Sequence, residues 1–332
     1  MNKRIIALLL LASFAFTACT QQPAESSASD TSADTTETSE TTETTTEETT
    51  EATTVETTAM TTVPFEPVPQ PEDAVVPEGY HFVWGDEFDG EELSNMWTRE
   101  SHPSHWVNNE LQVYDMSEEY SYVSDGNLII QPSKVVDDDG NVTYYSGRVN
   151  SYGHFVCQYG RIEARIKTPE GVGFLPAFWM LPITGQWPVG GEIDIMEIVG
   201  GMENKTHGTI HYGNPHDQNQ GSITADVDLS ADYHIYAVDW EPGKITFLLD
   251  GEPFYETSYW YSSPLTGYVA DYPAPFNKPF YIIFNVAVGG DWPGDPTEDT
   301  HFDERAQMRV DWVRVYQRDA YDENVTCPEA KD

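Results

Sequence analysis

Basic residues are scarce in this chain. Lysine and arginine together number 16 of 332 residues, against 56 aspartates and glutamates, so the formal net charge is −40. Much of the acidity lies near the N-terminus, but the remainder of the chain is acidic too. A field of this sign repels nucleic acid and anionic lipid, whereas a neutral substrate tolerates it. We therefore expect no nucleic-acid partner.

Cysteine is also rare. The chain has 3, Cys19, Cys157 and Cys327, and their spacing does not match a metal-ligand motif. Cys19 lies in an apolar leader, which leaves the other two. They either pair in an oxidising compartment or remain unpaired thiols, one of them packed in the core. The sequence leaves both arrangements open.

An apolar run covers Ile5–Phe16, directly after two basic residues. It is too short to cross a bilayer as a permanent helix, and its layout is typical of a secretory signal. The segment Phe16–Cys19 resembles the lipobox of bacterial lipoproteins, in which the cysteine becomes the lipidated first residue. The alternative is a plain cleaved signal from which Cys19 is discarded. Residues 1–19 therefore predict an extracellular protein, held at a bacterial cell surface by a lipid that is its one contact with the membrane.

The next segment, residues 20–75, is rich in Thr, Glu, Ser and then Pro. Such a composition cannot bury enough apolar surface to offset the entropy of ordering, so it predicts a disordered, extended linker. Residues 76–318 are rich in aromatic and β-branched side chains and are long enough for one core, with a short tail at 319–332. We expect a single catalytic domain on a stalk, and a monomer.

Strand-like segments dominate residues 76–318. Short β-branched and aromatic runs such as "YGRIEARIKT", "THGTIHYG" and "QMRVDWVRVYQ" alternate with Gly, Pro, Asn or Asp, which predicts an all-β sandwich or jelly roll. The Asp250-Gly251 pair between two apolar runs predicts a hairpin. The more continuous apolar run "NKPFYIIFNVAVGG" predicts a central strand buried on both faces.

Three acids stand close together in "GGEIDIMEIVG". Alternation along a strand places Glu192 and Asp194 on one face and Glu197 on the other. A β-bulge at Met196 would absorb one residue and return Glu197 to the face of the other two. The two glutamate Cα atoms would then lie about 13 Å apart, and inward-leaning side chains would bring the carboxyls within about 5 Å, as in a retaining glycosidase.

A solvated acidic strand face and a calcium site are the alternatives for these acids. A strand without carbonyl-rich loops is a poor calcium cage. Aromatic residues in nearby Gly- and Pro-rich segments favour a sugar site, because flat apolar rings suit the C–H face of a sugar. These residues are Trp106, Trp179, Trp187 and Trp292.

The chain resembles glycoside hydrolase family 16, in particular its bulged, laminarinase-like branch of endo-1,3-β-glucanases. The segments that carry the resemblance occur in the family's order: "GDEFDG", "WVNNELQVY", "YGRIEARIK", "PAFWMLP", "GGEIDIMEIVG", "TIHYG", "FNVAVGGDWPG" and "RVDWVRVY". The resemblance implies an all-β, concanavalin-like β-sandwich jelly roll of two curved antiparallel sheets, with the substrate in the cleft of the concave sheet.

The resemblance also implies roles for single residues. Glu192 would be the nucleophile and Glu197 the acid/base, with Asp194 tuning the nucleophile. His211 would lie on the leaving-group side. Asn108, Glu110 and Arg148 would line the glycone side, with Trp179, Trp187 and Trp292 as aromatic contacts to sugar. No cofactor is implied for catalysis, but a structural calcium would bind Asp311 together with backbone oxygens near Glu87 and Gly126.

We therefore expect a secreted, retaining endo-β-1,3-glucanase that acts on β-glucan. The acidic domain favours a neutral glucan over sulphated galactans, which some members of the branch cleave. Hydrolysis of mixed-linkage β-1,3-1,4-glucan or of a galactan, transglycosylation, and non-catalytic glucan capture remain alternatives.

Overall fold

The computed structural model describes residues 68–262 and 270–328. The predicted signal, the lipobox and most of the predicted linker lie outside these residues. Within them, no helix has the length and apolar character needed to cross a membrane.

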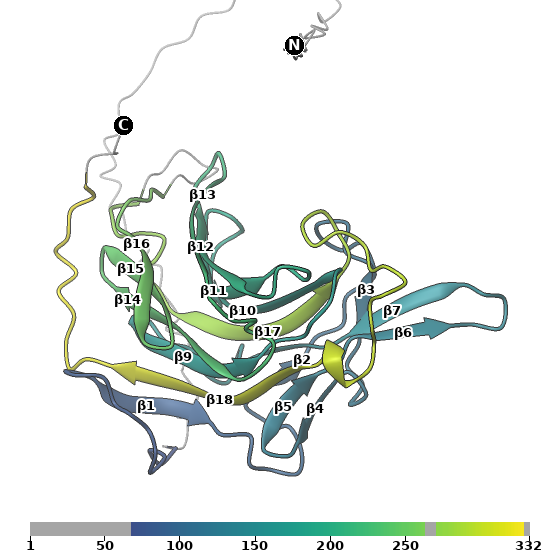
Figure 1. The fold of residues 1–332 in the computed structure, drawn as a ribbon. Coiled ribbons are helices and arrows are strands. Elements are labelled where there is room, and N and C mark those ends of the chain that lie inside the picture. The colour runs from purple at the N-terminus through teal and green to yellow at the C-terminus, as the bar shows by residue number, and fades with distance from the viewer. Residues whose placement is uncertain (1–67, 263–269, 329–332) are drawn as a thin grey trace, which may run out of the picture. The chain divides into compact units, whose positions relative to one another are not determined.

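Two antiparallel sheets are packed face to face (Figure 1). The strands of the first, in spatial order, are β16 (Glu252–Thr257), β15 (Lys244–Leu249), β14 (His234–Glu241), β9 (Gly160–Lys167), β18 (Met308–Gln317), β5 (Asn127–Ile130) and β4 (Ser121–Ser124), with β1 (His81–Asp86) also paired to β18. The strands of the second are β13 (Asp217–Thr224), β12 (Lys205–Tyr212), β11 (Glu192–Ile198), β10 (Phe174–Pro182), β17 (Phe280–Val288), β8 (Arg148–Asn150) and β2 (Thr98–Arg99). The predicted two-sheet jelly roll is confirmed.

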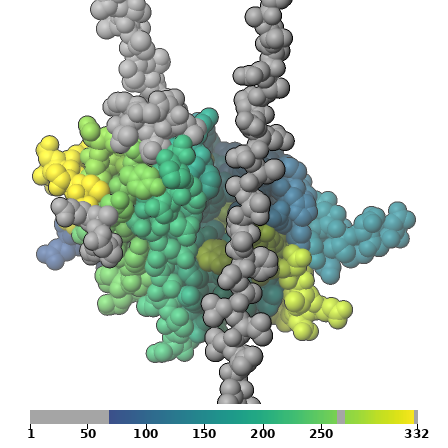
Figure 2. Space-filling model, turned by 90° about the horizontal axis from the view of Figure 1, so that it is seen from above, coloured from purple at the N-terminus to yellow at the C-terminus, as the bar shows by residue number. Residues whose placement is uncertain are grey.

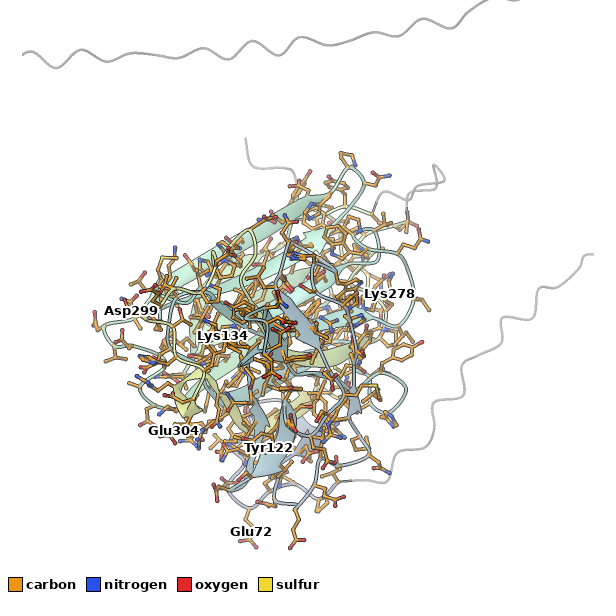
Figure 3. All side chains as sticks on the ribbon, turned by 90° about the vertical axis from the view of Figure 1, so that its right-hand side faces the viewer. Glu72, Tyr122, Lys134, Lys278, Asp299 and Glu304 are labelled. Atoms are coloured by element: carbon orange, nitrogen blue, oxygen red, sulfur yellow. The ribbon has the colours of Figure 1, made fainter. Side chains whose placement is uncertain are left out.

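Alternating side chains build the core between these sheets. Ile162, Ala164 and Ile166 of β9 are fully buried, as their period-2 spacing predicts. All but one of the residues of β17 are buried, and β17 lies inside its sheet between β10 and β8, so the predicted central strand is confirmed. Side chains fill the space between the sheets, while the labelled acids Glu72, Asp299 and Glu304 lie at the periphery (Figure 3).

The predicted hairpin at Asp250-Gly251 is also present. Both residues have positive φ, 51° and 84°, and they join β15 to β16. Such a turn twists in the sense that the flanking strands require.

A small third sheet was not predicted. It contains β3 (Gln112–Tyr114), β7 (Val142–Ser146) and β6 (Ser133–Val136), and β3 pairs with β7 in parallel. The β6–β7 hairpin projects from the body of the domain (Figure 2). β3 and β7 are distant in the sequence, and parallel strands are not joined by a tight turn, so no turn motif marks their pairing.

The N-terminal end of the described chain contacts the domain. Val68 packs against the core, and the Asp73 carboxylate binds Arg314 at 2.8 Å, although both positions fall in the predicted linker.

Cys157 and Cys327 are both free thiols, the first buried and the second exposed. Of the two arrangements that the sequence left open, the structure has the unpaired one, and burial raises the pKa of Cys157 to about 12.

Candidate active site

A bulge in β11 aligns the three acids. On the β10 side, Trp179 lies opposite Asp194 and Phe178 opposite Met196, so Ile195 is skipped. On the β12 side, the register shifts between Asp194 and Glu197. The predicted bulge is therefore confirmed, but the extra residue opposite β10 is Ile195 rather than Met196. Both residues are buried, because the bulge turns them toward the core and leaves the acids on the open face.

The partner strand accommodates the bulge with a glycine. Gly208 of β12 lies between the residues opposite Asp194 and Glu197. A Cβ atom at this position would come within 2.4 Å of the ring of Phe247. A side chain here would have to displace a fully buried aromatic ring, so the close packing requires glycine.

A cleft of about 800 Å³ lies over this sheet. Glu192, Asp194 and Glu197 line it, and so does each of the predicted sugar-binding residues. Those residues are Asn108, Glu110, Arg148, Trp179, Trp187, His211 and Trp292. Because its walls come from β12 and β13 at one edge and from β8 and β17 toward the other, the cleft runs across the strands.

Glu192 has a donor that stabilises negative charge, and a histidine lies beside Asp194. The indole Nε1–H of Trp187 donates to the Glu192 carboxylate. His211 Nε2 lies 3.3 Å from Asp194 Oδ2, an ion-pair distance, but this buried oxygen accepts no hydrogen bond from the described residues. Burial raises the pKa of Glu192 well above its usual range, and the charge of Asp194 and a hydrogen bond with Asp194 raise it further, whereas His211 and Trp187 lower it. Burial also raises the pKa of Asp194, to about 7.

Glu197 has weaker support for its charge. Thr209 Oγ1 donates to its carboxylate at 3.5 Å, the limit of a hydrogen bond. Burial raises the pKa of Glu197 well above its usual range, and the charges of Asp194 and Glu192 raise it further, whereas His211 and Thr209 lower it. Three buried carboxylates this close cannot all be ionised at neutral pH. The indole donor on Glu192 favours the proton on Glu197, whereas the hydrogen bond between Glu192 and Asp194 favours a proton on Glu192.

The other end of the cleft is built around Arg148. Its guanidinium lies 4.6 Å from the centre of the Trp179 ring and 5.5 Å from that of Trp106. Its Nε donates to Glu100 at 2.8 Å. The Trp179 indole in turn donates to Asn285 at 2.7 Å. These contacts fix the planes of two aromatic rings in the cleft wall, as stacking on a sugar requires.

Asn108 and Glu110 complete this end of the cleft. Asn108 has a positive φ of 50° and donates from Nδ2 to Glu110 at 3.2 Å. Glu110 is buried, and Gln112 donates to its second oxygen at 2.8 Å. Burial raises the pKa of Glu110, with Gln112 and Asn108 opposing this effect.

Three tryptophans that line the cleft are unusually exposed. Trp187 is 57% exposed, Trp106 44% and Trp292 40%. Large aromatic rings left open in a cleft mark a contact surface for a ligand rather than packing.

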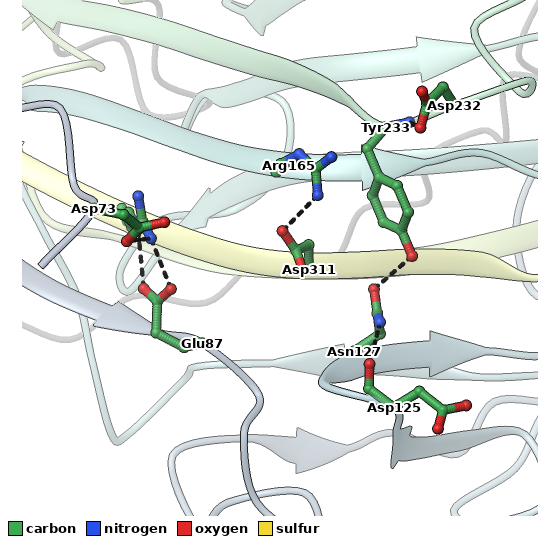
Figure 4. Close-up of polar contacts among 9 residues, drawn as sticks. Asp73, Glu87, Asp125, Asn127, Arg165, Asp232, Tyr233 and Asp311 are labelled. Atoms are coloured by element: carbon green, nitrogen blue, oxygen red, sulfur yellow. Dashed lines mark hydrogen bonds and ion pairs between the residues drawn. The ribbon is translucent and has the colours of Figure 1, made fainter. Parts of the chain in front are cut away.

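Two carboxylates at the predicted calcium site are paired with arginines. Asp311 Oδ2 accepts a hydrogen bond from Arg165 at 2.7 Å, and both oxygens of Glu87 accept from Arg314 (Figure 4). Gly126 lies in the turn between β4 and β5. The one carboxylate predicted to bind calcium is thus already neutralised, whereas calcium takes six to eight oxygen ligands. Calcium binding at Asp311 stays a prediction, and no step below uses it.

Within the described part of the chain, one group of acidic and histidine side chains could reach a small cation. It contains Glu192, Asp194 and His211, with ligand atoms within 4.8 Å of one another. This group coincides with the three-acid cluster, so a metal there would occupy the carboxylates rather than assist them.

Several residues that line the cleft were not among the predicted site residues. They are His216, Gln218, Gln220 and Asn285, among others. The alternation of Gln218 and Gln220 in β13 was a usable signal, since both fall on one face. His216 lies in a turn, where no periodicity marks it.

Comparisons with known proteins agree with this geometry. The family model described as "Glycosyl hydrolases family 16" matches residues 85–314. The chain is 38% identical over 262 residues to a glucan endo-1,3-beta-glucosidase A1 of Niallia circulans, covering 72% of this chain and 38% of that relative. It is 36% identical over 249 residues to a beta-glucanase of Rhodothermus marinus, covering 71% and 85%.

A solved structure has the same fold. The endo-beta-1,3-glucanase of Pyrococcus furiosus superposes with a TM-score of 0.62 at 34% identity, covering 74% of this chain and 98% of that one. The match therefore spans the described domain but about two fifths of the length of the Niallia circulans relative. The aligned acids, the aromatic cleft and these matches together show that the chain belongs to glycoside hydrolase family 16, in its laminarinase-like branch.

Proposed function

We propose that this protein is a retaining endo-β-1,3-glucanase that cleaves internal bonds of β-glucan. The observation that carries the proposal is the unequal support of two glutamates on one bulged strand. Glu192 accepts from an indole N–H and has Asp194 and His211 beside it, whereas Glu197 has a single long hydrogen bond. A nucleophile must be ionised and a general acid protonated, and this asymmetry supplies both.

In the first step, Glu192 attacks the anomeric carbon while Glu197 gives its proton to the departing glycosidic oxygen. The C–O bond to the leaving sugar breaks, and an ester bond to Glu192 forms. As negative charge leaves Glu192, repulsion from it decreases, and Glu197 becomes the base for the second step. Glu197 then removes a proton from water, which attacks the anomeric carbon and releases Glu192.

Endo action follows from the shape of the cleft. It crosses several strands, so a polymer can lie across the sheet with sugars on both sides of Glu192 and Glu197. The sugars on the Arg148 side would stack on Trp179 and Trp106, whose planes are fixed by Arg148. The Niallia circulans relative is described as a glucan endo-1,3-beta-glucosidase and the Pyrococcus furiosus structure as an endo-beta-1,3-glucanase, which supports β-1,3-glucan as substrate.

The same proposal places the enzyme outside the cell. The leader and the lipobox-like Phe16–Cys19 support secretion and lipid anchoring, and the Thr- and Glu-rich segment would hold the domain away from the surface.

Product analysis on laminarin tests the function. The full chain should release short β-1,3-oligosaccharides, and Glu192→Gln should lose at least about 10³-fold in rate, because an amide cannot act as nucleophile. Glu252→Gln, which makes the same change at an exposed acid of β16 outside the cleft, is the matched control. Binding without products from either protein would instead support glucan capture, and products from lichenan alone would support a mixed-linkage substrate.

A further inference from the structure

His216 occupies a defined position beside the catalytic acids, although it contacts none of them directly. It lies in the turn between β12 and β13 and lines the cleft. The turn is held from outside the cleft, since Tyr261 donates its hydroxyl to the backbone oxygen of Pro215 at 3.0 Å. His216 itself is exposed, so its position depends on this contact of the turn and on its two ring neighbours, His211 and Trp187.

His216 touches both side chains that support the nucleophile. Its Nε2 lies 2.9 Å from His211 Nδ1, and the two rings stack at 5.1 Å with an interplanar angle of 21°. Its ring also lies 4.9 Å from that of Trp187. Trp187 donates to Glu192, and His211 faces Asp194.

The hydrogen bond between the two histidines can run in either direction, depending on their tautomers. If neutral His211 donates from Nδ1 to His216, its bare Nε2 lies against the Asp194 carboxylate, which is repulsive, so Asp194 favours the tautomer with the proton on Nε2. In that tautomer Nδ1 is an acceptor, and His216 donates to it from Nε2. If His211 is charged, its Nδ1–H donates to His216 and its Nε2–H still faces Asp194. In both favoured states the contact with His216 supports a proton on Nε2, and this support is lost when His216 is absent.

We propose that His216 is a positioning residue that holds the Nε2 proton of His211 toward Asp194 and packs Trp187 beside Glu192, so that the nucleophile is kept ionised. The inference rests on the proposed hydrolytic function and deepens it, since it assigns the support of the nucleophile to a residue outside the acid triplet.

The charged groups around His216 give the direction of the effect on pH dependence. His211 faces it from β12 and Asp217 adjoins it on β13, while Glu192 and Asp194 of β11 face His211. Burial and the charge of His211 lower the pKa of His216, whereas Asp217 raises it, and the net shift favours the neutral imidazole. His211 lowers the pKa of Glu192. If His211 loses its orientation, the pKa of Glu192 should rise, and the acidic limb of the pH–rate profile should move to higher pH.

The test compares His216→Phe, which keeps a ring beside Trp187, with His216→Gln, whose amide can donate or accept. His216→Phe should lower kcat on laminarin about 3- to 10-fold with little change in KM. It should also move the acidic limb of the pH–rate profile to higher pH. His216→Gln should recover part of both effects. In a His211→Asn background, His216→Phe should add nothing, because the residue through which it acts is gone. His234→Phe, which removes a histidine paired with Asp250 elsewhere, is the matched control.

A second measurement needs no substrate. Nitrogen NMR of the imidazoles should show His211 protonated at Nε2 in the wild type and a mixture of tautomers in His216→Phe. An unchanged tautomer, or a full additional loss in the His211→Asn background, would overturn the proposal. If the wild type released no products from laminarin, the proposed function would fail, while the NMR result would still decide the positioning role.

Discussion

Glu163 provides a test of how burial of charge limits the stability of this domain. It lies on β9, is 9% exposed, and pairs across the sheet with Arg314. Both nearby guanidinium groups are already engaged, Arg314 with Glu87 and Asp73, and Arg161 with Asp239. Burial therefore raises the pKa of Glu163 to about 7, against a usual value of 4.5, although Arg161 and Arg314 oppose the effect.

A raised pKa in the folded state makes stability fall as pH rises. Below about pH 4.5 the Glu163 carboxyl is protonated in both the folded and the unfolded state, so its burial does not lower the stability. Between about pH 4.5 and pH 7 it ionises freely only in the unfolded chain, which favours unfolding. At about 1.4 kcal/mol per pKa unit, the wild type should lose up to about 3 kcal/mol across this window. The side chain of Glu163→Gln is neutral at every pH, so this variant should not show that pH-dependent loss of stability.

Urea unfolding at pH 5 and pH 8 measures this difference. We expect Glu163→Gln to equal the wild type within about 1 kcal/mol at pH 5 and to be more stable by about 1 to 3 kcal/mol at pH 8. Glu252→Gln, on the exposed end of β16, is the control for removal of an acid from the same sheet. If Glu163→Gln were less stable than the wild type at pH 8, the charge would be compensated by its arginines and the reasoning refuted.

Other predictions concern the cleft and its frame. Glu197→Gln should lower kcat on laminarin by at least about 10²-fold. It should also remove the alkaline limb of the pH–rate profile, because that limb reports loss of the proton from the general acid. An unchanged alkaline limb would assign the proton to another group. Trp179→Phe should raise KM several-fold, because the indole donor to Asn285 is lost while the stacking partner of Arg148 remains as a smaller ring; initial rates over a range of laminarin concentrations check this. Gly208→Ala should cost about 2 kcal/mol or more in unfolding free energy, because its Cβ would meet Phe247, and wild-type stability would contradict the close packing described here. Added EDTA should leave the melting temperature unchanged, because Arg165 already neutralises Asp311; a clear fall would instead support calcium at that position.

The local pattern of the sequence predicted most of the architecture. In β9 the apolar residues alternate and are buried as expected, and the Asp250-Gly251 turn has the positive φ angles that its residue types favour. The acid triplet was readable for the same reason, since a strand has a period of two and a displaced third acid implies a bulge. The residue skipped opposite β10, Ile195, was not readable, because the register depends on the neighbouring strand.

The sequence by itself therefore determined the strand content, the face that the three acids share and, through resemblance, the residues of the cleft. The tertiary structure decided which groups meet. Arg165 neutralises Asp311 across 146 residues, and His216 reaches His211 and Trp187 from a turn with no periodic signal. The physical reason is that protonation and charge pairing depend on distances between strands that are distant in sequence, and these distances exist only after the sheets have paired and packed.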